Sequence, residues 1–255
     1  MHALTTEQRV GVSAARNVGF RHARGRFLAL LDSDDVWLPD FLAAQLAVFD
    51  RAPAADVVSG NAFNLGGPRD GQLLRPPSEE CRPITLIDMI EHEDAVLVMS
   101  VLRRRVVEAI GGFSEDLRRS EDYDFWLRAA SAGFHFVANP TPLVRYRRHA
   151  SSASSDEVLM LDSMIVALQR LRASPLASHV VVATLDRRID ALNERRLWTS
   201  AKAKLMRREY AAAADDLESL AQLRRSLRVR LIAGASRSVP AALRFAYRTK
   251  TALRV

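Results

Sequence analysis

The sequence predicts an α/β domain over residues 1–154, followed by an all-α region over residues 155–255. Strand and helix patterns alternate as far as about residue 149, which is the order typical of α/β proteins. Residues 27–31 form a continuously apolar run, which suits a strand buried on both faces of a mostly parallel sheet. Beyond residue 155 the strand patterns end and helical periodicity continues.

The individual elements are expected in the following order. Helical patterns in the α/β part cover residues 12–24, 40–51, 85–93, 103–110 and 122–133. Strand patterns in the same part cover residues 27–31, 56–63, 96–102 and 135–138. A stretch rich in glycine and proline, residues 64–77, predicts an exposed loop. Longer helices are expected in the C-terminal region over residues 156–172, 176–206 and 209–225.

Composition and charge exclude several classes of function. The single cysteine, Cys81, excludes a disulfide framework and a zinc site built from several cysteines. No apolar run is long enough for a transmembrane helix. The net charge of +7 is uneven: residues 1–149 carry −2 and residues 150–255 carry +9. No basic patch is interleaved with aromatic residues, so we expect no nucleic-acid binding.

The basic charge is concentrated in residues 224–255, which contain nine basic side chains and no acidic one. Such a segment is attracted to an anionic membrane surface. It therefore predicts peripheral contact with the membrane, although a solvated helical face would explain the same charges.

Three carboxylates within four residues, Asp32, Asp34 and Asp35, follow the apolar strand pattern. In open α/β sheets, ligands bind beyond the carboxyl ends of the strands. Carboxylates this close repel one another unless a cation joins them, and a hard divalent ion would also bridge to substrate phosphates. The alternative is that Asp35 caps a helix and the other two are merely acidic neighbours.

A second motif combines the paired glycines Gly111-Gly112 with Glu121-Asp122 at the start of a predicted helix. A carboxylate in this position can act as a general base if it reaches a substrate hydroxyl. It can equally be a structural charge that the helix dipole stabilises. Asp124, two residues further on, is the expected structural partner.

Taken in order, these segments closely resemble family 2 glycosyltransferases. The resemblance covers about residues 8–154 and implies a GT-A fold. Its motifs are Ala15-Arg16-Asn17-x-Gly19, Gly25-Arg26-Phe27, Leu31-Asp32-Ser33-Asp34-Asp35-x-Trp37-x-Pro39, Gly111-Gly112-Phe113, Glu121-Asp122 and Tyr146-Arg147-Arg148-His149.

The resemblance assigns expected roles on the donor side. Asp32 and Asp34 match the family's DxD motif, which holds a manganese or magnesium ion against the diphosphate of a nucleotide-sugar donor. His149 is a candidate third ligand of that ion, with a lone surface histidine as the alternative. Arg16 and Asn17 match an element beside the donor, although a solvent-facing arginine and a turn asparagine would also explain them.

On the acceptor side, the resemblance makes Asp122 the base that removes the proton from the acceptor hydroxyl. Gly112, Glu121 and Trp126 are placed near the acceptor, while the aromatic residues after Asp122 also fit core positions. The implied reaction is inverting transfer of a single sugar to a glycan or lipid-linked acceptor. Its expected setting is bacterial cell-envelope or exopolysaccharide synthesis, in the cytoplasm or at the inner face of the membrane.

One part of the family pattern has no counterpart in this sequence. Family members begin with a strand, a helix and a second strand ending in Asp-Asp-Gly-Ser, which together hold the nucleoside. We therefore expect a start upstream of Met1, a gene fragment, or a second chain that supplies this nucleotide-binding segment. The alternative function is a non-catalytic fragment or a partner-dependent interaction protein that retains part of the GT-A fold.

Overall fold

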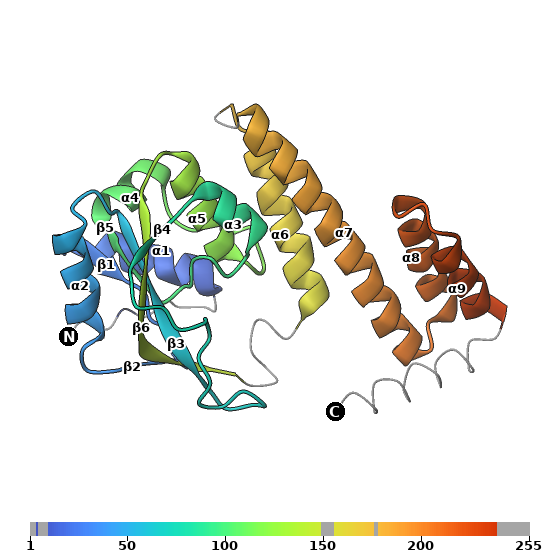
Figure 1. Ribbon diagram of the computed structural model, residues 1–255, viewed down its shortest axis with the longest axis horizontal. Helices are drawn as coiled ribbons and strands as arrows, with labels where there is room; N and C mark the ends of the chain where they lie inside the picture. The colour runs from blue at the N-terminus through green and yellow to red at the C-terminus, as the bar shows by residue number, and fades with distance from the viewer. Residues whose placement is uncertain (1–3, 5–9, 149–155, 176–177, 239–255) are drawn as a thin grey trace.

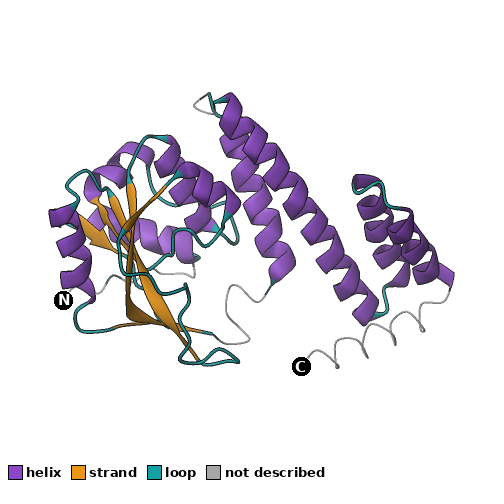
Figure 2. Cartoon of the chain, in the orientation of Figure 1, coloured by secondary structure: helices purple, strands orange, loops and turns teal. Residues whose placement is uncertain are grey.

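The computed structural model of the chain describes residues 4, 10–148, 156–175 and 178–238. A sheet with helices on both faces forms one end of the molecule, and a row of helices extends away from it (Figures 1 and 2). The strands are β1 (Phe27–Ala29), β2 (Val36–Trp37), β3 (Val57–Leu65), β4 (Arg82–Ile84), β5 (Ser100–Arg103) and β6 (Phe136–Arg147). The helices are α1 (Val12–His22), α2 (Phe41–Arg51), α3 (Leu86–Glu91), α4 (Arg104–Ile110), α5 (Glu121–Ser131), α6 (Glu157–Arg172), α7 (His179–Arg207), α8 (Tyr210–Leu223) and α9 (Leu227–Ser238).

The strands run in the order β1-β5-β3-β6-β2, and β4 pairs with β6 outside this path. The α/β prediction is confirmed, but the expectation of a mostly parallel sheet is wrong. Among the strands of the described residues, only β3 and β6 pair in parallel, whereas the other four pairs are antiparallel. The apolar run that suggested parallel strands shows that a strand is buried on both faces of the sheet. Such burial does not determine whether its neighbours run parallel or antiparallel to it.

Alternate residues of the central strands face two separate cores. Val57 of β3 and Leu102 of β5 belong to a cluster with α1, α4 and α5 on one face. Their neighbours Val58 and Val101 belong to a cluster with Phe41, Val48 and Phe49 of α2 on the other face. Burial on both faces fixes the sheet between these helices and positions the strand ends that carry the acidic residues.

The first helices of the C-terminal region continue the core of the sheet domain. Leu161 and Leu168 of α6 and Leu185 of α7 lie in the same buried cluster as α1 and α5. The far end of α7 packs with α8 and α9 around a small separate cluster of Ala201, Leu217 and Ala233. The predicted division at residue 154 stays a prediction, since residues 149–155 lie outside the described part. None of the helices in the described ranges is long and apolar enough to cross a membrane.

Candidate active site

The acidic residues lie in a tight turn between β1 and β2. The backbone N–H of Asp35 donates to the carbonyl of Asp32 at 3.1 Å, and the Asp35 side chain is buried. Its Oδ1 accepts from the backbone N–H of Arg147 at 2.9 Å, while the Arg147 Nε donates to the Asp34 carbonyl at 2.8 Å. These bonds fasten the end of β6 to the acidic turn. The helix-cap alternative for Asp35 is wrong, because α2 begins six residues later, at Phe41, with Asp40 at its N-cap.

Burial raises the pKa of Asp35 to about 6, and the negative charges of Asp34 and Asp32 contribute in the same direction. A cation bound at this turn would oppose the repulsion among these negative charges.

Arg16 connects this turn to the second predicted motif. Its Nη2 donates to Asp32 Oδ1 at 2.5 Å and its Nη1 donates to Glu121 Oε1 at 2.8 Å. The side chains of Arg16 and Glu121 are each 12% exposed, so this three-residue bridge is largely shielded from water. The guanidinium also lies 5.1 Å from the centroid of the Phe113 ring. Arg16 thus joins sequence segments that are 105 residues apart.

Asn17 holds the glycine turn in place. Its Oδ1 accepts from the backbone N–H of Phe113 at 2.8 Å, and its Nδ2 donates to the Phe113 carbonyl at 3.0 Å. A Cβ on Gly112 would lie 2.1 Å from the Asn17 Oδ1, so only glycine fits there without rearrangement. This geometry supplies a structural reason for both residues; their contact with donor or acceptor remains a prediction.

The first turn of α5 carries three acids with different partners. Glu121 pairs with Arg16, and Asp124 is buried and accepts from Ser114 Oγ at 2.6 Å and from Arg128 Nε at 2.8 Å. The structural role predicted for Asp124 is confirmed. Asp122 accepts from the backbone N–H of Tyr123 at 2.8 Å and has no ion pair within the described residues. Asp122 is therefore the acid of this turn that is available to a substrate.

Asp122 lines a cavity of about 580 Å³. The pKa of Asp122 is raised to about 6, chiefly by burial and also by the neighbouring charge of Glu121, while Arg16 opposes both effects. A carboxylate titrating near neutral pH is well suited to accept a proton from a hydroxyl.

The walls of this cavity come from distant parts of the chain. The segment between α3 and β5 contributes Val96 and Met99, and the end of β6 contributes Tyr146 and Arg148. The C-terminal helices contribute Glu157, Met160, Met164 and Arg195. Tyr146 and Arg148 belong to the Tyr-Arg-Arg-His motif that the sequence showed. Sequence reasoning did not single out the other wall residues, because they belong to no recognisable motif and are brought together only by packing.

Two of the predicted site residues need separate comment. Trp126 is 1% exposed and packs edge-on against Phe125 and Phe136 in the core beneath α5. It follows Asp122 by one turn of α5, and its predicted place beside the acceptor stays a prediction. His149 lies outside the described residues.

The chemistry of the acidic turn fits a hard cation. Among the residues that the structure describes, no three His, Cys, Asp or Glu side chains gather as a metal-binding group. Asp32 and Asp34 would therefore supply two carboxylates, and phosphate oxygens of a substrate would complete the oxygen coordination that Mg²⁺ or Mn²⁺ requires. Both carboxylates lie in the turn that follows β1, one residue apart.

The fold of the chain is similar to that of GT-A type glycosyltransferases. Residues 2–111 match the model described as Glycosyl transferase family 2. The succinoglycan biosynthesis protein ExoO of Rhizobium meliloti is 30% identical over 219 residues, which cover 80% of this chain and 61% of that protein. A glucosyltransferase of Escherichia coli, WfgD, is 26% identical over 180 residues, covering 68% of this chain and 66% of that protein.

Solved structures show the same fold. Staphylococcus aureus TarS 1–349 in complex with UDP-GlcNAc has a TM-score of 0.58 at 17% identity, covering 94% of this chain and 72% of that one. A mannosyltransferase of Pyrobaculum calidifontis, PcManGT, in complex with GDP-Man and Mn²⁺, has a TM-score of 0.53 at 19% identity, covering 97% and 64%. The chain spans 49% to 61% of the lengths of the first curated relatives it matches.

Proposed function

We propose that the chain carries out inverting sugar transfer, with Asp122 as the base that removes the proton from an acceptor hydroxyl. The observation that supports this most directly is the position of Asp122. It alone among the acids of the first turn of α5 lacks a cationic or hydroxyl partner in the described part of the chain. It also lines a cavity large enough for a sugar and has a pKa raised to about 6.

The donor is proposed to be a nucleotide sugar bound beside the acidic turn. Two structural relatives are described in complex with UDP-GlcNAc or with GDP-Man and Mn²⁺, which supports both a nucleotide-sugar donor and a divalent cation. Asp32 and Asp34 would hold the cation, which when bound would neutralise the departing diphosphate. Arg16 would keep Asp32 oriented toward the donor, because it fixes that carboxylate from the side of α1.

The acceptor is proposed to be a glycan or a lipid-linked sugar that enters the cavity of Asp122. The E. coli relative is named as a glucosyltransferase acting on α-D-GlcNAc-diphosphoundecaprenol, and ExoO is named for succinoglycan biosynthesis. Apolar side chains such as Met160 and Met164 lie in the same cavity as Arg148 and Arg195. This mixture suits a sugar, which presents apolar faces together with hydroxyl groups.

The test is Asp122→Asn, assayed by release of nucleoside diphosphate from a panel of UDP-, GDP- and ADP-sugars with glycan acceptors. Loss of a general base lowers the rate by about 10²–10⁴-fold. Donor binding, followed by calorimetry, is expected to be unchanged. The matched control is Asp116→Asn, since the Asp116 side chain is 64% exposed and pairs with Arg170 away from the cavity. Full turnover in Asp122→Asn would rule out the base role, and absence of donor binding by the wild-type chain would favour the non-catalytic alternative.

We further propose that the C-terminal basic segment contacts an anionic membrane, which would place the enzyme at the cytoplasmic face. Leu227 and Leu231 of α9 are 74% and 75% exposed and lie one turn apart, with the exposed Arg228 beside them. Replacing both leucines by serine is expected to weaken partitioning onto vesicles that contain phosphatidylglycerol. Val180→Ser on α7 is the control, since Val180 is 73% exposed and lies outside the basic segment. Unchanged partitioning of the leucine variant would contradict the membrane proposal.

A further inference from the structure

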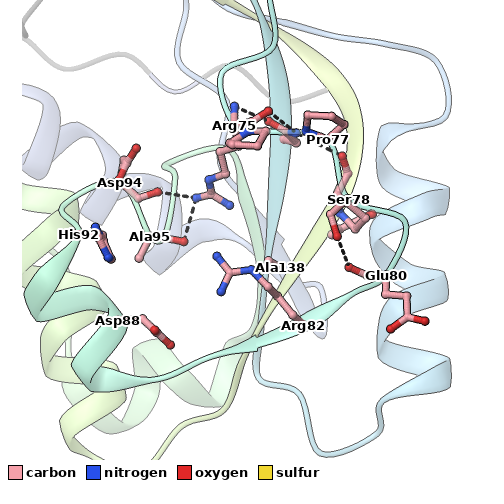
Figure 3. A pocket seen from close by; sticks show the side chains of 14 residues that line it. Arg75, Pro77, Ser78, Glu80, Arg82, Asp88, His92, Asp94, Ala95 and Ala138 are labelled. Atoms are coloured by element: carbon pink, nitrogen blue, oxygen red, sulfur yellow. Dashed lines mark hydrogen bonds between the residues drawn. The ribbon is translucent and has the colours of Figure 1, made fainter.

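A second cavity, of about 510 Å³, lies between β4, α3 and the loop that follows β3 (Figure 3). Its lining includes the charged side chains of Arg75, Arg82 and Asp88, none of which lines the Asp122 cavity. Asp94, in the segment between α3 and β5, lines both cavities. The second cavity is therefore adjacent to the candidate active site without being part of it.

Arg75 brings a positive charge to this cavity, where backbone carbonyls hold its guanidinium and the charge of Asp94 also acts on it. Its Nη2 donates to the backbone carbonyls of Asp94 and Ala95 at 2.7 and 2.8 Å. Arg75 forms no ion pair within the described residues. Burial lowers its pKa to about 10. An anion entering the cavity would therefore meet a guanidinium that is partly desolvated and held in a fixed position.

Arg82 of β4 supplies a second guanidinium. Figure 3 shows its side chain directed into the cavity, whereas the Glu80 carboxylate points away from it. The side chain of Arg82 makes no hydrogen bond or ion pair with the other residues that the structure describes, and its charge adds to the lowering of the Arg75 pKa. Two like charges thus face one space, an arrangement that a bound oxyanion would stabilise.

The side of the cavity opposite the two guanidinium groups offers hydrogen-bond acceptors. Asp88 Oδ2 accepts from the backbone N–H and the hydroxyl of Thr85 at 2.8 and 2.7 Å, so this carboxylate is held by a capping box. Its second oxygen remains able to accept from a ligand hydroxyl, and His92 lines the same side. Guanidinium groups opposite a fixed carboxylate suit a ligand that carries both an oxyanion and hydroxyl groups.

We propose that this cavity binds an acidic sugar residue, with its carboxylate or phosphate on Arg75 and Arg82 and a hydroxyl on Asp88. Because Asp94 lines both cavities, the acidic sugar would be a further unit of the glycan acceptor whose terminal sugar reaches Asp122. The position of the acidic sugar within the acceptor rests on the proposed function, whereas its binding to this cavity does not.

The test measures binding of D-glucuronate, glucose 6-phosphate and glucose by ligand-observed NMR, with EDTA present and no nucleotide sugar. At least one acidic sugar is expected to bind about tenfold or more tightly than glucose, as charge-assisted hydrogen bonds would produce. Arg82→Ala is expected to abolish this preference. Arg69→Ala is the matched control, since Arg69 is exposed in the same loop and does not line the cavity. Arg82→Gln and a thermal melt of each variant show whether loss of binding reflects loss of the fold.

The two acidic probes separate the sources of the oxyanion. A preference for glucuronate assigns a uronic acid, and a preference for glucose 6-phosphate assigns a phosphorylated sugar. Equal binding of all three sugars, or equal behaviour of Arg82→Ala and Arg69→Ala, would overturn the proposal. Asp122→Asn is expected to bind the acidic sugar normally, so a failure of the catalytic proposal would leave this result unaffected.

Discussion

Replacement of Arg16 by glutamine tests whether the bridge between the two motifs holds the site together. The variant removes one cation from between Asp32 and Glu121, whose side chains are 30% and 12% exposed. Two charge-assisted hydrogen bonds are lost, and two partly shielded carboxylates remain close to Asp122 without compensation. Loss of one member of a shielded ion pair destabilises a protein by up to about 3–5 kcal/mol. Because these carboxylates are only partly buried, we expect the free energy of unfolding to fall by about 2–4 kcal/mol.

The measurement is urea unfolding of wild type and variant at pH 7.5 and pH 5. Burial raises the pKa of Asp122 to about 6, so this carboxyl is largely protonated at pH 5 and repels its neighbours less. The loss of stability is therefore expected to be smaller at pH 5 than at pH 7.5. Arg172→Gln is the control, because Arg172 and its partner Asp186 are 51% and 48% exposed and such surface pairs contribute about 0–1 kcal/mol. Equal losses in the two variants, or a larger loss at pH 5, would refute the reasoning.

Three further predictions concern the glycine turn, the base and the helical region. Gly112→Ala is expected to lower the free energy of unfolding by about 2–4 kcal/mol, because the new Cβ displaces the buried Asn17 amide from its partners. Gly19→Ala should instead raise the free energy of unfolding by about 0.5–1 kcal/mol, because Gly19 lies within α1 and a Cβ there would meet open space. Thermal melts compare the two glycine variants. If transfer depends on deprotonated Asp122, kcat/KM is expected to fall about tenfold per pH unit below the pKa of about 6 and to level off above neutral pH. A flat pH profile of kcat/KM from pH 5 to 8 would contradict the assignment of Asp122 as the base. Leu168→Ala is expected to destabilise the sheet domain by about 2–5 kcal/mol, since Leu168 is fully buried in its core; hydrogen exchange of β3 and β5 would report the change.

Local patterns predicted those parts of the site that are close together in sequence. The acidic turn, the helix with Arg16 and the acids of α5 are each encoded by a few neighbouring residues. The assignment of Asp124 to a structural role also followed from its position in the first turn of a helix. What the sequence could not supply was the Arg16 bridge, because an ion pair between residues 105 positions apart has no local signature.

The strands that were missed or shortened depend on distant partners. β2 and β4 contain only two and three residues, and each exists through antiparallel pairing with β6. β6 runs to Arg147 although Pro140 and Pro142 interrupt its apolar pattern, and prolines usually end such a strand. The strand continues because the register with β3 shifts at Asn61, whose side-chain Nδ2 donates to the Pro140 carbonyl at 3.2 Å. A side chain on the neighbouring strand therefore takes part in pairing where the proline cannot donate.

The functional unit extends well beyond the segment that identifies the family. The family match ends at residue 111, the candidate base lies at Asp122, and the wall of its cavity reaches Arg195 on α7. Arg195 is held in that wall by ion pairs to Glu93 at 3.1 Å and Glu157 at 2.9 Å, which tie α7 to the segment before β5 and to α6. Because α6 and α7 also complete the core beneath α5, any shift of these helices would move both the base and the acceptor cavity. In the proposed reaction, the helical region would therefore help to determine which acceptor is recognised, while the acidic turn on the sheet would serve the donor.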